Sequence, residues 1–240
     1  MKLAVLGDIH SNLEAFEAVL ADLDKQRPDR LFCVGDIVGY GPNPRECLAL
    51  IRERGIETVQ GNHDYYVAND DELSAFQPLA QTTIYWHKVV CNAKEQAFLR
   101  SLPWALSTND VQVLHTPTIG ENRWRYILDM PDIKAAFANT QGQIVFIGHT
   151  HRPGIYLDEE PILKIRKMSL TLPTDPRVLV NVGAVGQPRD GDPRACWCLY
   201  DSTRRHVQIR RCKYDHKKTA GKIRKAGLPA RLARRLGLGK

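Results

Sequence analysis

The sequence predicts an α/β fold in one domain, and two features of its hydrophobic pattern support this prediction. Up to Val59, short apolar strands alternate with helical segments, which is typical of a parallel sheet covered by helices. From Gly154 onward the apolar residues instead recur with a period of two, which is typical of antiparallel strands. We therefore expect these later strands to form a second sheet.

The expected elements follow from apolar runs and helical periodicity. The first part of the chain gives strands at 2–6, 31–34 and 56–59 and helices at 13–25 and 44–54. Residues 65–110 are helical in composition and form an expected helical insert. After it come a strand at 111–114, a helix at 133–138 and a strand at 144–147. The expected antiparallel strands are 155–157, 162–165, 178–182, 196–200 and 207–211.

The composition is that of an ordinary globular protein, with 43% hydrophobic and 25% charged residues among 240. The residues after Met1 enter the first expected strand directly, and no apolar run is long enough for a signal peptide or a membrane span. The six cysteines are scattered and form no C-x-x-C pair, which favours reduced, buried thiols. We expect a cytoplasmic protein that has no membrane partner.

The positive net charge of +7 is concentrated in residues 213–240, where ten Lys or Arg face a single acid, Asp215. One interpretation is a nucleic-acid-binding tail. The favoured interpretation is a pair of short amphipathic helices packed on the body of the protein, because apolar residues recur at roughly helical spacing. These residues are Ala220, Ile223, Leu228, Leu232 and Leu236.

Polar side chains that can bind a metal ion follow five of the expected strands. Any one of them alone would usually be a turn or surface residue. In an open α/β sheet, however, ligands bind at the carboxyl ends of the strands, so residues distant in sequence converge there. In chain order these candidates are Asp8 and His10, Asp36, Asn62, His115, and His149 and His151.

This set of oxygen and imidazole ligands favours Mn, Fe, Zn, Ni or Co over copper or an iron–sulfur cluster. Seven ligands are too many for one catalytic ion that keeps an open position. They suit two ions if one carboxylate bridges, and a pair of ions is a common device for phosphoryl displacement. The pattern therefore predicts two divalent metal ions.

Five motifs, GDIHSN, VGDIVGYGPNP, GNHD, the strand-terminal His115 and GHTHRP, resemble in order and spacing those of the calcineurin-like metallophosphoesterases. The greatest likeness is to the small bacterial branch that includes YfcE-like phosphodiesterases. It covers nearly the whole chain, because NVGAVGQPRDGDPRACWCLYD also looks like that branch. The resemblance implies a four-layer αββα sandwich of two mixed β-sheets flanked by helices.

The resemblance also implies roles for individual residues. One ion would be held by Asp8, His10, Asp36 and His151, and the other by Asp36, Asn62, His115 and His149, with Asp36 bridging. A hydroxide between the ions, with Mn expected first, would attack phosphorus in line. His63 would protonate the leaving group. Its neighbour Asp64 would either orient the His63 ring or face solvent.

In the Ser/Thr protein phosphatases of this family, the second motif reads Gly-Asp-x-Val-Asp-Arg-Gly, and its Arg binds the phosphate. In this sequence Gly39 and Tyr40 occupy the positions of the second Asp and of the Arg. Bidentate recognition of phosphate would have to come from another Arg. Arg189 is the first candidate, and Arg123 and Arg125 come next. We expect substrate contacts from Arg189, Arg125 and Tyr40.

The leading hypothesis is a metal-dependent phosphoesterase that acts on a small phosphomonoester or phosphodiester, with nucleotides among the candidates. A Ser/Thr protein phosphatase and a dinucleoside-polyphosphate hydrolase are alternatives within the same chemistry. A metal-bound scaffold protein is the non-enzyme alternative, although the presence of His63 speaks against it. Processing of nucleic acid is a further hypothesis, suggested only by the basic segment.

Overall fold

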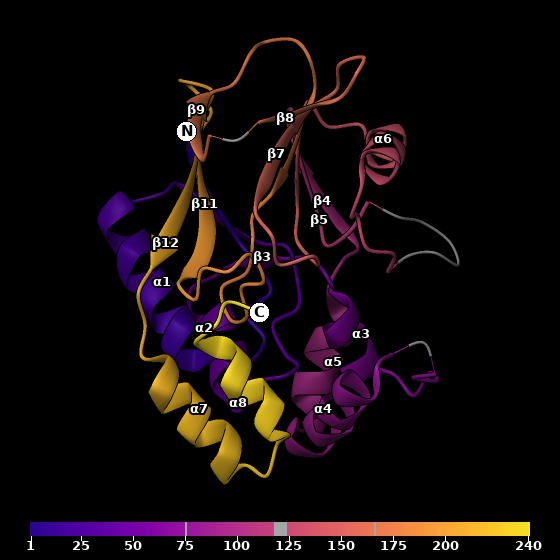
Figure 1. The fold of residues 1–240 in the computed structure, drawn as a ribbon, viewed down its shortest axis with the longest axis vertical. Helices are drawn as coiled ribbons and strands as arrows, with labels where there is room; N and C mark the ends of the chain where they lie inside the picture. The colour runs from indigo at the N-terminus through magenta and orange to yellow at the C-terminus, as the bar shows by residue number, and fades with distance from the viewer. Residues whose placement is uncertain (75, 118–123, 166) are drawn as a thin grey trace.

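The computed structural model describes residues 1–74, 76–117, 124–165 and 167–240. Its strands form two six-stranded sheets that share one core between them (Figure 1). The first sheet has the order β3 (Glu57–Thr58), β2 (Arg30–Cys33), β1 (Lys2–Leu6), β11 (Ala195–Asp201), β12 (His206–Cys212) and β9 (Ser169–Thr171). The second has the order β4 (Ala105–Thr108), β5 (Val111–Leu114), β6 (Ile144–Ile147), β10 (Val178–Asn181), β7 (Gly154–Leu157) and β8 (Leu163–Ile165).

Helices cover the outer faces of the sheets and gather at one end of the molecule, at the bottom of Figure 1. Helices α1 (Leu13–Gln26) and α2 (Pro44–Glu53) lie on the first sheet, and α6 (Met130–Ala138) lies on the second. The remaining helices are α3 (Asn62–Ala68), α4 (Pro78–Val90), α5 (Ala93–Ser101), α7 (His216–Lys225) and α8 (Ala230–Leu236).

Strand β1 shows how the layers arise, because its side chains alternate between two apolar cores. Ala4 and Leu6 pack with Phe16 of α1 in the core under the helices. Leu3 and Val5 point the other way and pack with residues of the second sheet in the core between the sheets. A strand that is buried on both faces reads as a continuous apolar run, as β1 does. The expected four-layer sandwich is confirmed.

The predicted assignment of strands to sheets was wrong. The later strands do not form a sheet of their own: β11, β12 and β9 complete the first sheet, where β11 pairs antiparallel with β1. Strands β7, β8 and β10 complete the second, where β10 lies parallel to β6. A period of two reports only that one face of a strand is buried, so it does not identify the neighbouring strand.

The expected helical insert also needs a correction. Its helices α4 and α5 are present, but its last part is the strand β4, which forms a hairpin with β5. Thr108 pairs with Val111, so Asn109 and Asp110 make a two-residue turn, and Asn109 has a φ of 46°. Asn and Asp tolerate this conformation in hairpin turns. Strand β9 was not predicted either.

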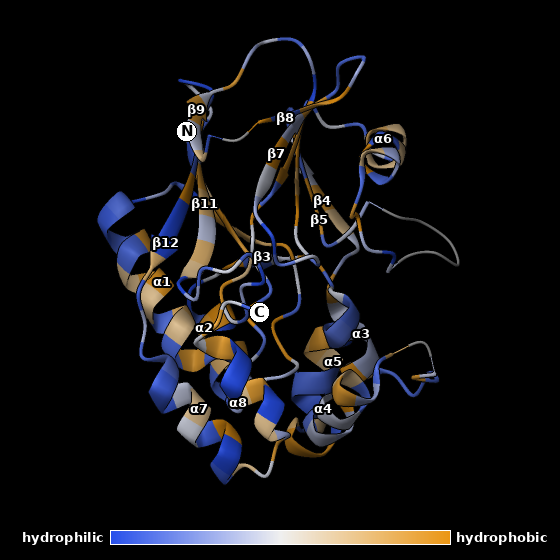
Figure 2. Ribbon diagram, viewed as in Figure 1, coloured by the Kyte–Doolittle hydropathy of each residue, from blue (hydrophilic) through white to orange (hydrophobic). Residues whose placement is uncertain are grey.

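The basic C-terminal segment forms the two helices α7 and α8, which confirms the favoured interpretation. Their apolar residues make a buried cluster with Tyr40 and Ala80, and Figure 2 shows both helices as blue and orange faces. Polar contacts add to this packing. Thr219 Oγ1 lies 3.0 Å from Asn12 Oδ1 and 3.0 Å from Glu14 Oε2. The segment is therefore docked on the start of α1.

All six cysteines are described, buried and free of disulfide bonds, as predicted. Within the described ranges, no helix has both the length and the apolar character that a membrane span requires.

Candidate metal centre

All seven residues singled out at the strand ends lie at one edge of the two sheets. Loops after β1 and β2 carry Asp8, His10 and Asp36, and Asn62 is the first residue of α3. The second sheet contributes its candidate ligands after β5 and β6. In Figure 1 this edge faces the helical end of the molecule. Every one of the seven is buried, with at most 5% of its surface exposed: Asp8, His10, Asp36, Asn62, His115, His149 and His151.

The first group of potential ligands contains Asp8, His10, Asp36 and His151, and one ligand atom of each lies within 4.8 Å of the others. His10 Nε2 and His151 Nε2 are 3.0 Å apart. His151 Nε2 is 3.3 Å from Asp8 Oδ1. Two carboxylates and two imidazoles at these separations form a set of donors suited to a divalent ion.

The second group contains Asp36, His115 and His149, and the amide oxygen of Asn62 joins it. Asn62 Oδ1 is 3.0 Å from His115 Nε2 and 3.1 Å from His149 Nδ1. Asp36 belongs to both groups, because its Oδ2 is 3.5 Å from His10 Nε2 and 3.5 Å from His115 Nε2.

Backbone carbonyls fix which ring nitrogen of each histidine faces the centre. The outer nitrogen of each ring lies next to one carbonyl oxygen and donates its hydrogen there. The pairs are His10 Nδ1 with Val38 (3.0 Å), His115 Nδ1 with Val34 (2.7 Å), His151 Nδ1 with Gln187 (2.7 Å) and His149 Nε2 with Trp124 (2.9 Å). In the neutral ring the inner nitrogen then carries a lone pair. Lone pairs 3.0 Å apart repel unless a cation lies between them.

The backbone at these residues is strained. Five of the seven have positive φ angles between 47° and 67°, where L-residues other than glycine lose roughly 1–3 kcal/mol each. The tight loops bring each side chain back over the sheet edge. Strain of this kind persists where the surrounding structure imposes it, and it is common at functional sites. The five are Asp8, His10, Asp36, His149 and His151.

Burial shifts the pKa values of the acidic and basic groups in opposite directions. It raises the pKa of Asp8 to about 6, and together with the nearby carboxylates of Asp64 and Asp8 it raises that of Asp36 well above its usual range. It lowers the pKa values of His10 and His151 well below their usual range. A divalent cation is bound by neutral imidazoles and by carboxylates, and it supplies the counter-charge that the buried carboxylates need. The residues present therefore fit metal ions.

Residues 1–204 match the family model of the calcineurin-like phosphoesterase superfamily domain. The chain belongs to this family. The uncharacterized protein MJ0912 of Methanocaldococcus jannaschii is 39% identical over 242 residues, which cover 99% of this chain and 98% of that protein. The crystal structure of a metallophosphoesterase from Sphaerobacter thermophilus is 35% identical and covers 100% of this chain and 99% of its own, with a TM-score of 0.87.

A shorter match is to the symmetrical bis(5'-nucleosyl)-tetraphosphatase of Psychromonas ingrahamii, which is 33% identical over 66 residues. That match covers 26% of this chain and 24% of that enzyme. The predicted superfamily and the predicted class of enzyme are confirmed: the chain is a phosphoesterase, and its family implies divalent metal ions.

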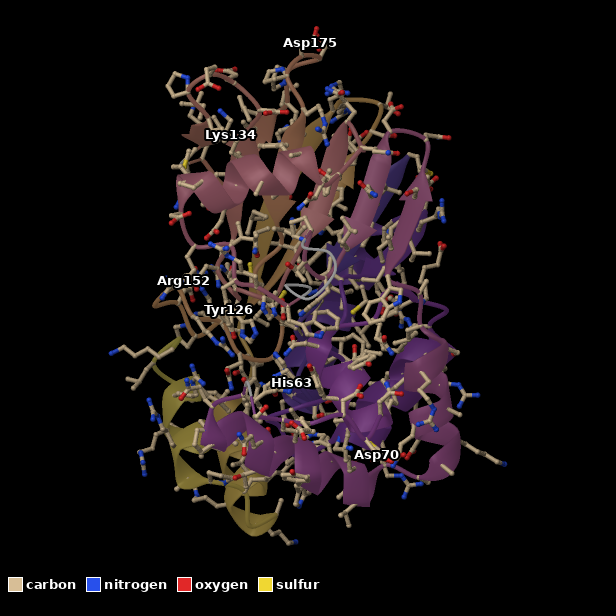
Figure 3. The ribbon with its side chains drawn as sticks, turned by 90° about the vertical axis from the view of Figure 1, so that its right-hand side faces the viewer. His63, Asp70, Tyr126, Lys134, Arg152 and Asp175 are labelled. Carbon is tan, nitrogen blue, oxygen red and sulfur yellow. The ribbon has the colours of Figure 1, made fainter. Side chains whose placement is uncertain are left out.

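His63 lies beside the metal-ligand groups of this phosphoesterase. Figure 3 shows it between the strands and the helical end of the molecule. Its ring centroid is 4.9 Å from that of His10 and 4.5 Å from that of Tyr40. Its Nδ1 is buried and has no hydrogen-bond partner among the described residues. Burial lowers the pKa of this ring well below its usual range.

Asp64 matches neither of the two roles predicted for it. It is fully buried, so it does not face solvent. Its Oδ1 accepts a hydrogen bond from the Val38 amide (3.1 Å), and its Oδ2 accepts one from the Gly61 amide (3.1 Å). Both oxygens therefore bind backbone, and among the described residues no contact joins Asp64 to the His63 ring. The residue caps α3 and ties it to the loop after β2.

Gly39 shows how tightly the loop after β2 is fitted to the site. Its φ is +97°, and a Cβ placed there would lie 2.5 Å from His63 Nδ1 and 3.1 Å from His10 Nδ1. Glycine is required here both by the backbone conformation and by the approach of the two rings.

Arg189 and Tyr40, for which we expect substrate contacts, lie beside the centre. The Arg189 guanidinium is 5.7 Å from the Tyr40 ring centroid and donates to Gln187 Oε1, 2.9 Å from Nη2. Its positive charge lowers the pKa values of Asp8 and Asp36, against the larger effect of burial.

The structure does not place Arg125 with them. Its Nη2 is 2.8 Å from Asp132 Oδ1 at the start of α6, and its side chain is 64% exposed. Among the described residues, Asp132 is its ion-pair partner, so this guanidinium is already paired with a carboxylate. Arg123 lies outside the described residues.

Three nearby residues were missed from the sequence. Tyr126 stacks on the His149 ring, with centroids 4.2 Å apart and an angle of 22° between the planes. Trp124 and Gln187 supply the carbonyls that orient His149 and His151. No motif marks a residue that acts through its backbone, but Gln187 lies in the quoted GQPRDGD stretch and could have been found there.

Proposed function

We propose that this phosphoesterase holds two divalent metal ions, one in each ligand group, and hydrolyses a small phosphomonoester or phosphodiester. Asp8, His10, Asp36 and His151 would hold one ion. Asp36, Asn62, His115 and His149 would hold the other. When bound there, the ions would supply a hydroxide nucleophile near neutral pH, by lowering the pKa of water, and would neutralise phosphoryl oxygens. Mn is the first metal to test, with Fe, Zn, Ni and Co as alternatives.

The observation that carries this proposal is the shared oxygen of Asp36. The same Oδ2 lies 3.5 Å from a histidine of each group. A carboxylate at the boundary of two groups is suited to bridging two ions. If only one ion were bound, the nitrogen lone pairs of the other group would stay buried next to one another and repel.

The surrounding residues have roles that follow from their positions. His63 would protonate the leaving oxygen, and its unpartnered Nδ1 supports a role in which the substrate completes its contacts. A phosphoryl anion bound beside this ring opposes the effect of burial and favours its protonated form. Arg189 would bind phosphoryl oxygens that project from the centre.

The test compares metal-free protein with protein reloaded with Mn, assayed on p-nitrophenyl phosphate and bis-p-nitrophenyl phosphate. We expect two ions per chain by mass spectrometry and turnover that depends on them. The variant Asp36→Asn should lose activity by about a thousandfold or more, equal to about 4 kcal/mol of transition-state stabilisation. It should also bind fewer than two ions.

The matched control is Asp70→Asn, because Asp70 is a fully exposed carboxylate that pairs with Lys88, and Figure 3 shows it well away from His63. It should keep both ions and full activity. Full activity with a single ion per chain, or full activity in Asp36→Asn, would contradict the dinuclear proposal.

A further inference from the structure

Aromatic rings lie against both histidines of the second ligand group. The Trp124 ring centroid is 5.9 Å from that of His115, and the Tyr126 ring stacks on His149 with centroids 4.2 Å apart. Figure 3 shows Tyr126 in the same middle part of the molecule as His63. The chemistry proposed for the metal centre uses neither aromatic ring, so their place beside it calls for a different explanation.

Trp124 belongs to a cluster of three rings, with Tyr65 of α3 and Trp104, which we call the aromatic platform. The Trp104 centroid is 5.5 Å from that of Trp124 and 5.6 Å from that of Tyr65. The centroids of Tyr65 and Trp124 are 6.2 Å apart. All three distances lie in the range at which aromatic rings attract one another, so the rings hold each other in place.

Trp104 is the part of the platform that reaches solvent. It is 44% exposed, which makes it the most exposed of the four tryptophans of the chain. A tryptophan usually buries most of its large ring. An exposed tryptophan that continues an aromatic cluster from a candidate active site is typical of a binding surface for a planar, apolar group.

The backbone next to Trp104 is tied to the segment that leads into α3. The Gln60 amide donates to the Pro103 carbonyl (2.8 Å), and Gln60 Nε2 donates to the Leu99 carbonyl (2.6 Å). Gln60 is buried and lies two residues before Asn62, a candidate metal ligand. Trp104 is therefore held at a fixed position relative to the metal centre, as a residue that selects a substrate has to be.

We infer that the aromatic platform stacks on the nucleobase of a nucleotide whose phosphoryl group is bound at the metal ligands. The inference rests on the proposed function and narrows its substrate class from small phosphoesters to nucleotides. Trp124 lies next to His115, and Trp104 lies one ring farther along. A planar group joined to phosphorus through a spacer such as ribose is suited to reach Trp104, which is the specificity-determining residue. Every base has a π-face, so the platform accepts any of them.

Calorimetric binding to the Mn-loaded, full-length protein tests this inference without relying on turnover. The two probes are AMP and methyl β-D-ribofuranoside 5-phosphate, which share the sugar and the phosphoryl group and differ in the adenine. Titrations are run in the cold with excess Mn, and chromatography checks that both probes remain intact. We expect AMP to bind at least about tenfold more tightly than the sugar phosphate, as one stacked base provides.

The variant Trp104→Leu should reduce this preference about tenfold and leave the affinity for the sugar phosphate unchanged, because it removes a ring and no phosphoryl contact. Trp104→Phe keeps a smaller ring and should retain part of the preference. Tyr85→Leu is the matched control, since Tyr85 is an aromatic residue of α4 that is 58% exposed. No ring contact joins Tyr85 to the platform within the described residues, so this variant should behave as the unmodified protein. Melting temperatures show whether each variant is folded.

An unchanged preference in the folded Trp104 variants would overturn the inference, and so would an equal loss of affinity for both probes. If the protein hydrolyses p-nitrophenyl esters while the preference for AMP is absent, only the inference fails. If it binds neither probe and hydrolyses neither ester, the proposed function fails with it.

Discussion

The loops that carry the candidate metal ligands and the C-terminal helices beside them are built in different ways. The loops have unfavourable backbone angles and are held by hydrogen bonds to neighbouring loops, such as the His10 amide to the Asp36 carbonyl (2.9 Å). Helices α7 and α8 have ordinary backbone conformations and are held by an apolar cluster and a few ion pairs. The position of the candidate metal ligands thus depends on strained loops, whereas the position of α7 and α8 depends on packing.

The largest expected effect lies at the candidate metal centre, where His63 is the second residue of α3. His63→Gln should lower kcat by about 10²–10⁴-fold, the usual contribution of a general acid. The loss should be greater for an alkyl phosphate than for p-nitrophenyl phosphate, because a good leaving group needs little protonation. Steady-state kinetics on both substrates measure the difference. An equal loss on both would contradict the role of His63 as an acid.

A substitution in helices α7 and α8 should instead change the stability of the protein. Leu232→Ala removes a fully buried side chain from the α7–α8 cluster, and such changes cost about 2–5 kcal/mol. Thermal or urea unfolding measures the loss. Leu238→Ala is the matched control, because Leu238 is 56% exposed, and it should change stability little. Equal effects of the two variants would show that α8 is not packed as described.

A smaller, pH-dependent effect is expected from His87, which connects α4 to the ligand loop. Its Nδ1 donates to the Thr83 carbonyl (2.7 Å), and its Nε2 accepts from the Ser11 hydroxyl (2.9 Å). Burial lowers its pKa from 6.5 to about 4, so the folded protein favours the neutral ring. The stability from this residue is therefore present above pH 6.5 and is lost as the pH falls toward 4, by about 3 kcal/mol in total.

The check is a series of unfolding experiments between pH 7 and pH 4. His87→Gln should be less stable than the unmodified protein at pH 7 and should lose less stability on acidification. Parallel curves for the two proteins would contradict the assignment of this pH dependence to His87.

Much of the site could be predicted because the ends of the strands are easy to recognise in the sequence. Each apolar run that stops at a polar residue marks a point on the sheet edge, and the parallel pairing of β1 with β2 and of β5 with β6 aligns several of these points. The structure brings all seven strand-end residues together. His63 was predicted to lie next to them, and it does.

Other features depend on contacts between residues distant in the chain. The surface on which α8 lies is set by its packing on Tyr40, and helical periodicity does not specify the surface that an amphipathic helix covers. The burial of Asp64 depends on the Val38 and Gly61 amides that it binds. The distribution of the later strands over both sheets could not be predicted for the same reason, since a strand with one buried face can pair with several neighbours.

The left-handed angles at the ligands have a consequence for how such an enzyme can lose its activity. His149 and His151 have φ angles of 67° and 59°, which glycine adopts without the penalty that histidine incurs. Exchange of either residue for glycine would remove a candidate metal ligand and relieve backbone strain in one step. Selection for heat resistance alone would therefore favour inactive variants of this chain, and a screen for stability has to be joined to an assay of catalysis.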